Sequence, residues 1–120
     1  MIIAVTAEGR NLTAEVDPRF GRAQRFLLVD SETMKFEVVE NRQSLNLPQG
    51  AGIQAAQNLV NHGAQVLLTG SCGPKAFRTL VAAGIKVVVG VRGRIEDVVS
   101  DYLEGKYQQA TGANVEGHWA

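Results

Sequence analysis

The chain has 120 residues, which is the size of one domain. Hydrophobic residues make up 45% of it and charged residues 20%, so the composition is that of a folded globular protein and not of a disordered one. Lys plus Arg count 12 and Asp plus Glu count 12, and this balance excludes a surface that is basic throughout, as binding to duplex DNA or to an anionic membrane would require.

The apolar runs are short, and none approaches the roughly 20 residues of a membrane-spanning helix. No basic segment followed by an apolar stretch opens the chain, so we expect no secretory signal. The chain has 1 cysteine, Cys72, which cannot form an internal disulfide. These features together predict a cytoplasmic protein.

The first part of the chain is predicted to form three strands. Residues 2–6 are apolar and β-branched and predict a strand buried on both faces. Residues 10–22 predict a long loop, which is more often functional than a passive connection. Strands follow over residues 26–30 and 35–40, and the short turn at 31–34 predicts that they form an antiparallel hairpin.

Helices and strands alternate in the second part. We predict helices over residues 52–62, 74–83 and 95–103, and strands over residues 65–69 and 85–89. Each helix has a stripe of apolar residues that should face the core. These stripes are Ile53, Ala56 and Val60 in the first helix, Phe77, Leu80 and Val81 in the second, and Ile95, Val98, Val99, Tyr102 and Leu103 in the third.

This order of elements predicts an α/β fold, with a five-stranded mixed sheet and helices on its faces. We expect a single domain over residues 1–104 and a polar tail over 105–120. Ligands of such sheets lie beyond the carboxyl ends of the parallel strands. Here those ends are the glycine-bearing segments 7–10, 70–73 and 90–93, which together predict one ligand edge.

The segment Thr69-Gly70-Ser71-Cys72-Gly73-Pro74-Lys75 lies between a predicted strand and the start of a helix. The free N–H groups and the dipole of a helix start lower the pKa of a thiol, so we expect Cys72 to ionise more readily than an ordinary cysteine. A thiolate is a soft ligand that suits iron, copper or an iron–sulfur cluster. The alternative is a buried cysteine that packs as a small hydrophobic residue.

A second candidate lies in the long loop, where Arg19, Arg22 and Arg25 fall within seven residues, next to Asp17. Guanidinium groups suit anionic oxygen groups and attract a partner with distributed negative charge. The alternative is a solvated loop in which Asp17 caps a turn and Phe20 lies beneath it. Because Phe20 is the only aromatic residue there, we do not expect nucleic acid to bind.

The cysteine segment also permits a different chemistry. A Walker A phosphate loop needs four residues between its first glycine and its Gly-Lys pair. The cysteine segment lacks this spacing, so it is not a Walker A loop. The spacing of Cys72, Arg78 and Thr79 is similar to that of the cysteine phosphatase loop, which leaves a cysteine-dependent phosphatase as an alternative function. Pro74 opposes it, because proline removes one amide from such a cradle and starts the helix early, which turns Arg78 onto a helix face.

The two histidines differ in context. His62 ends the first predicted helix, where the dipole favours a cation, so we assign it a structural role. His118 and Trp119 stand in the polar tail, where His118 is a candidate metal ligand and Trp119 is a candidate anchor of the tail. The sequence has no Cys-x2-Cys or His-x3-His spacing, which excludes a closed structural zinc site.

Six short segments, spread through nearly the whole chain, carry a resemblance to a known family. They are residues 2–6, Asp17-Pro18-Arg19-Phe20-Gly21-Arg22, Gly50-Ala51-Gly52, Gly70-Ser71-Cys72-Gly73-Pro74-Lys75-Ala76, Ala83-Gly84-Ile85-Lys86-Val87, and the tail Gly-Ala-Asn-Val-Glu-Gly-His-Trp at residues 112–119. In their order and spacing they resemble the dinitrogenase iron–molybdenum cofactor biosynthesis family, of the NifX-like and NifB carboxyl-terminal type.

The resemblance implies a ribonuclease H-like motif with the sheet order 3-2-1-4-5. It also implies reversible binding of an iron–sulfur or iron–molybdenum cluster by a protein that is not an enzyme. Nucleases of that fold need metal-binding carboxylates on the sheet, and residues 2–6 and 66–69 contain none, so we expect no nuclease activity. Donor and acceptor proteins for the cluster are the expected partners, without nucleic acid or membrane, and the chain is expected to be a monomer or a weak homodimer.

The resemblance places the family's loop residues on Arg19 and Arg22 and its helix-start position on Cys72. The predicted cluster-binding residues are Arg19, Arg22, Gly70, Ser71, Cys72, Gly73 and His118, with Cys72 and His118 as the candidate metal ligands. A metal–sulfur cluster is anionic, so glycine-loop amides can donate to its sulfurs and arginines can balance its charge. A cluster bound by a single thiolate can dissociate, whereas a cluster bound by four thiolates is held permanently. A third possible function is a cofactor-free regulatory module that binds a partner through the arginine-rich loop.

Overall fold

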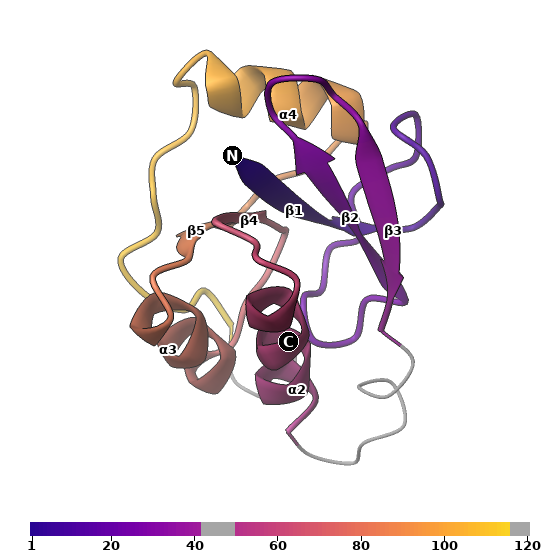
Figure 1. Ribbon diagram of the computed structural model, residues 1–120. Helices are drawn as coiled ribbons and strands as arrows, with labels where there is room; N and C mark the ends of the chain where they lie inside the picture. The colour runs from indigo at the N-terminus through magenta and orange to yellow at the C-terminus, as the bar shows by residue number, and fades with distance from the viewer. Residues whose placement is uncertain (42–49, 116–120) are drawn as a thin grey trace.

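The structure is a computed structural model that describes residues 1–41 and 50–115. Its described elements form one mixed sheet with helices on both faces (Figure 1). In chain order they are β1 (Ile2–Ala7), β2 (Arg25–Asp30), β3 (Phe36–Glu40), α2 (Ala51–Asn61), β4 (Val66–Leu68), α3 (Pro74–Ala82), β5 (Lys86–Val88) and α4 (Ile95–Leu103). The sheet order β3-β2-β1-β4-β5 confirms the order that the family resemblance implies, and the α/β class is confirmed with it.

β1 occupies the centre of the sheet, and nearly all of its side chains are buried there. It pairs antiparallel with β2 and parallel with β4, so that Val5 lies opposite both Leu27 and Leu68. β2 and β3 form the expected antiparallel hairpin, and β4 and β5 are parallel. The carboxyl ends of β1, β4 and β5 therefore meet at one edge of the sheet, which we call the ligand edge.

The sheet separates two hydrophobic cores. α2 and α3 cover one face and α4 covers the other (Figure 1). Successive residues of β1 point to opposite faces, so Ala4 belongs to the core beneath α2 and α3, whereas Ile3 and Val5 belong to the core beneath α4. This two-sided burial explains why the strand is a continuous apolar run with no polar alternation.

The predicted apolar stripes of the helices are wrong at three positions. Val60, Val81 and Leu103 are 41%, 45% and 46% exposed, although the spacing placed them against the core. In α2 the buried residues are instead small, with Leu59 as the exception: Ala51, Ala55, Ala56 and Leu59. The physical reason is that the buried face of α2 is centred on Ala51, Ala55 and Leu59, which are spaced four residues apart, and Val60 lies outside this row. Val81 and Leu103 lie in the last turns of their helices.

We expect Gly52→Ala to lower the free energy of unfolding by about 1 kcal/mol, although alanine is ordinarily the better helix former. An added Cβ at Gly52 would lie 2.9 Å from the Cβ of Ala76 on α3, closer than two methyl groups can approach. Urea unfolding measures the effect. The double variant with Ala76→Gly relieves the contact, so a coupling energy near zero between the two substitutions would contradict this account.

The described part of the chain after α4 lies against the folded body. The Ala110 N–H donates to the Val87 carbonyl of β5 at 2.7 Å, and the Asn114 N–H donates to the Cys72 carbonyl at 3.2 Å. Tyr107 is partly buried against the core beneath α4. Figure 1 shows this segment running down the side of the molecule from α4, past β5, toward α3. We call residues 105–115 the C-terminal strap. No helix within the two described ranges is long and apolar enough to cross a membrane.

Candidate functional site

The loops that leave the ligand edge are hydrogen-bonded to one another. The Gly90 N–H, after β5, donates to the Gly70 carbonyl, after β4, at 2.8 Å. The Val16 N–H, in the loop that follows β1, donates to the Gly93 carbonyl at 2.9 Å. The glycine-bearing segments after β4 and β5 therefore adjoin each other, and the loop after β1 reaches them through Val16. Two segments make up the candidate site: the arginine loop, residues 17–25, and the β4–α3 loop, residues 69–73.

The arginine loop docks directly on the β4–α3 loop. The Phe20 N–H donates to the Ser71 carbonyl at 3.0 Å, and the Ser71 hydroxyl donates to the Pro18 carbonyl at 2.8 Å. Arg19 and Ser71 also form an isolated parallel bridge. At Gly70 the two backbones are so close that an added Cβ would lie 2.6 Å from the Pro18 carbonyl oxygen. The contact thus requires glycine at this position, and it brings the two sequence candidates into one site.

A buried polar contact supports this docking from the sheet. The Thr6 hydroxyl donates to the Asp17 carbonyl at 2.6 Å and lies 3.0 Å from the Thr69 hydroxyl, and both threonines are fully buried. The Asp17 carboxylate accepts the Arg19 N–H at 3.0 Å, which is the capped turn of the alternative interpretation of this loop. Burial raises the pKa of Asp17, while this hydrogen bond and the charges of Arg19 and Arg25 act in the opposite direction.

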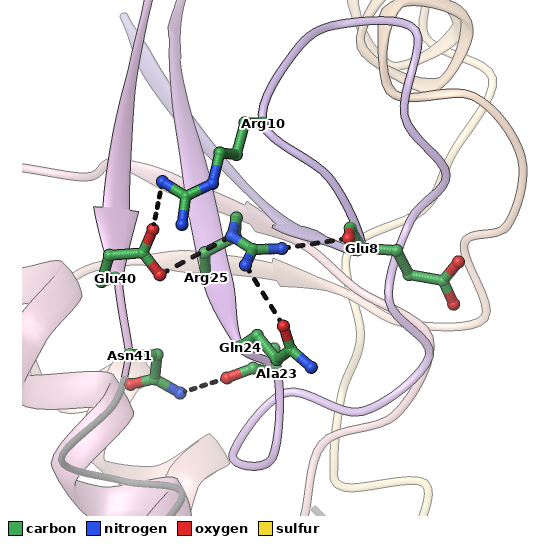
Figure 2. A network of polar contacts seen from close by, with 7 residues as sticks. All are labelled: Glu8, Arg10, Ala23, Gln24, Arg25, Glu40 and Asn41. Carbon is green, nitrogen blue, oxygen red and sulfur yellow. Dashed lines mark hydrogen bonds and ion pairs between the residues drawn. The ribbon is translucent and has the colours of Figure 1, made fainter.

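Asn41 holds the second half of the arginine loop. Its fully buried side chain donates to the Ala23 carbonyl at 2.8 Å, as Figure 2 shows, and to the Gly21 carbonyl at 3.4 Å. Its amide oxygen accepts a hydrogen bond from Asn58 of α2 at 3.3 Å. Sequence reasoning missed this residue, because an asparagine directly after a strand gives no sign of the loop that it binds in three dimensions.

Arg25 belongs to a network of polar contacts within the fold. It donates to the Glu8 carbonyl at 3.0 Å and to the Gln24 side chain at 3.2 Å, and its Nε lies 3.6 Å from the Glu40 carboxylate (Figure 2). Arg10 lies 2.6 Å from the same carboxylate. This network ties the loop after β1 to the ends of β2 and β3. Arg19, by contrast, is exposed, and Arg22 is half-buried.

The predicted activation of Cys72 is wrong. Its side chain is fully buried in the core beneath α2 and α3, together with Phe20 and Phe26, and its thiol contacts the Gly73 carbonyl at 3.7 Å. Burial raises the pKa of Cys72 to about 12, because the loss of hydration penalises the thiolate. The alternative of a packed, buried cysteine describes this structure. The role of Cys72 as a metal ligand stays a prediction, and it requires the thiol to be exposed first.

Asn114 closes the site from the side of the strap. Its amide oxygen accepts the Cys72 N–H at 2.8 Å, and its amide nitrogen donates to the Gly70 carbonyl at 3.0 Å. It belongs to the tail motif that carried the family resemblance, but the sequence drew attention to His118 and Trp119 of that motif. His118 lies outside the described residues, so its role as a ligand stays a prediction.

The remaining candidates stay apart from this site. Arg78 is exposed on α3, as the early helix start at Pro74 predicted, while the nearby thiol is buried and protonated. This geometry does not support a phosphatase. The His62 Nδ1 lies 2.7 Å from the Asn58 carbonyl at the end of α2, in keeping with a structural role. Within residues 1–41 and 50–115, no group of three or more His, Cys, Asp or Glu side chains could hold a metal ion.

Comparison with known protein families shows which family the chain belongs to. The family model described as dinitrogenase iron-molybdenum cofactor matches residues 1–105. The chain belongs to this family. Family membership associates the protein with binding of a cofactor cluster, and it confirms the resemblance that the sequence motifs carried.

Three relatives cover nearly the whole chain. The apo form of the orange protein from Desulfovibrio gigas is 52% identical, covers 95% of this chain and 96% of its own, and superposes with a TM-score of 0.93. A Thermotoga protein described as a candidate NifB protein is 34% identical over 97% of this chain and 98% of its own, with a TM-score of 0.81. An uncharacterized Methanocaldococcus jannaschii protein is 29% identical over 112 residues, which is 91% of each chain.

Proposed function

We propose that this protein is a non-catalytic carrier that binds an anionic metal–sulfur cluster, of the iron–sulfur or iron–molybdenum type, and passes it from a donor to an acceptor protein. The family name supports the class of cargo. A relative with half of its residues in common was determined as an apo form, which is the term for a protein without the group that it binds. The observation that carries the proposal is the docking of the arginine loop on the β4–α3 loop at the ligand edge.

This docking places positive charge beside a polar backbone. Arg19 is exposed next to Ser71, and Arg22 follows it in the same loop. α3 begins directly after the β4–α3 loop, and the first turn of a helix presents unpaired N–H groups and a partial positive charge. Both features favour an anion over a cation. An anionic cluster fits such a surface, which offers charge and hydrogen bonds to its sulfurs.

The number of available cysteine ligands favours weak, reversible binding of a cluster over a permanently bound cluster. A resident iron–sulfur cluster is held by four thiolates, and this chain has 1 cysteine. In this proposal the arginines attract the cargo first, and the backbone amides of residues 70–73 then hold it. The Cys72 thiol becomes a ligand only after the β4–α3 loop opens, and His118 is the second proposed ligand. A carrier benefits from such a site, because its cargo must leave.

The test is anaerobic reconstitution with iron, sulfide and molybdate, followed by desalting, metal analysis and a visible spectrum. The unchanged protein should be coloured and loaded with metal. The double variant Arg19→Glu with Arg22→Glu should retain about 10-fold less metal, because it replaces two attractive charges beside the cargo by two repulsive ones. Lys35→Glu is the matched control, since it reverses one exposed charge in the β2–β3 turn, at the opposite edge of the sheet.

Two results would contradict the proposal. An unchanged protein that stays colourless and binds no metal would exclude the carrier function. Equal loading of the double arginine variant and the Lys35→Glu control would show that cargo binds elsewhere. A colourless protein that captures a partner protein, and loses it in the double variant, would favour the regulatory module instead.

A further inference from the structure

The C-terminal strap occupies the polar groups of the β4–α3 loop through one residue. Asn114 accepts the Cys72 N–H at 2.8 Å, donates its side-chain amide to the Gly70 carbonyl at 3.0 Å, and donates its own N–H to the Cys72 carbonyl at 3.2 Å. These groups belong to the loop that the proposed cargo site uses. A cargo sulfur and the Asn114 oxygen therefore compete for the same amide.

The β4–α3 loop is held from two sides, and the two sides differ in strength. On one side it is bound to the arginine loop, where Phe20 is fully buried in the core. On the other side it is bound to Asn114, which is itself exposed, as are most residues of the strap between Tyr107 and Asn114. Segments with little buried apolar surface open at low free energy, so the strap is the side that opens first.

The near end of the strap is anchored separately. Lys106 bonds through its backbone N–H to the Asp101 carbonyl at 3.0 Å, and its ammonium group lies 3.3 Å from the Asp101 carboxylate and 2.9 Å from that of Glu104. Tyr107 follows and is partly buried. The strap can therefore lift from the β4–α3 loop while its base stays attached to α4.

We propose that Asn114 is a latch that holds the β4–α3 loop closed over Cys72, and that cargo enters only when this latch opens. The role in loading rests on the proposed carrier function, whereas the latch itself does not. Opening frees the Cys72 N–H and gives water access to the thiol, while the Gly70 carbonyl keeps its hydrogen bond from the Gly90 N–H. Cargo that binds the open loop in turn keeps the strap away, because each binding event shifts the same equilibrium.

Labelling of Cys72 tests the latch without any cargo. Cys72 is the single cysteine of the chain, so the rate of alkylation of the native, metal-free protein by iodoacetamide reports on this site alone. Asn114→Ala removes two side-chain hydrogen bonds and should raise that rate about 10-fold. Asn114→Asp keeps the acceptor for the Cys72 N–H and loses the donor to Gly70, so its rate should lie in between. Gln109→Ala changes an exposed residue of the same strap and should leave the rate unchanged.

Urea unfolding of each variant separates local opening from global unfolding. An alkylation rate in Asn114→Ala within a factor of two of that in Gln109→Ala would overturn the latch. The latch would also be overturned if the alkylation rate rose only by the factor by which the globally unfolded fraction rises. If Asn114→Ala fails to fold, Asn114→Asp and amide hydrogen exchange at Cys72 decide the same question.

Metal uptake then tests the role of the latch in loading. With iron and sulfide under anaerobic conditions, Asn114→Ala should load about 10-fold faster than Gln109→Ala, in proportion to the open population. Faster alkylation with unchanged uptake would overturn the role in loading. Faster alkylation with no metal in any variant, the unchanged protein included, would leave the latch established and the carrier function refuted, so the two failures are distinguishable.

Discussion

The free energy of unfolding is expected to fall by up to about 4 kcal/mol as the pH rises from 9 to 12, because the buried Cys72 thiol must stay protonated in the folded protein. Its pKa is raised from the ordinary value of 9.0 to about 12. A group whose pKa is raised by folding contributes stability that is fully present below its unfolded-state pKa. That stability is lost as the pH approaches the folded-state pKa.

Urea unfolding between pH 8 and 12 measures this loss, with Cys72→Ala as the control. The alanine variant is less stable at neutral pH because it leaves a small cavity, but it should lack the steep fall that the thiol causes. Tyr107 also has a raised pKa and contributes a smaller loss to both proteins. Parallel pH profiles of the two proteins would contradict the burial of the thiol described here.

Gly70→Ala is expected to lower the free energy of unfolding by about 3 kcal/mol and to reduce metal retention together with it. The new methyl group would lie 2.6 Å from the Pro18 carbonyl oxygen and 2.7 Å from the Pro18 Cα. Both are backbone atoms, so no side-chain rotation relieves the contact. The β4–α3 loop must then separate from the arginine loop.

Gly112→Ala is the matched control for this substitution. It makes the same chemical change in the C-terminal strap, where nothing lies within 4 Å of the added Cβ, so its stability should stay within about 0.5 kcal/mol of the parent. Urea unfolding and the anaerobic loading assay compare the two variants. If Gly70→Ala matched the control in both assays, the proposed site would not depend on the docking of the two loops.

The location of the candidate site could be predicted from the sequence, but the roles of its residues could be predicted only in part. Glycine-bearing segments after parallel strands indicate a ligand edge, and the structure brings the arginine loop and residues 70–73 together there. The sequence could not show that Arg25 is used in a structural network, since its partner Glu40 is distant in the chain. It also could not reveal Asn41 or Asn114, because a hydrogen bond to a distant backbone group leaves no periodic pattern.

The amino-acid pattern alone was sufficient for the α/β class and the order of the elements, because hydrophobic periodicity and turn residues act locally along the chain. The burial of Cys72 was not local. A helix start favours the thiolate, and that rule is correct for an exposed cysteine. In the folded molecule Cys72 is fully buried in the same core as Phe20 and Phe26, and the cost of removing a charge from water exceeds the gain from the helix dipole. Only the packing of distant segments decides which of these two effects is larger.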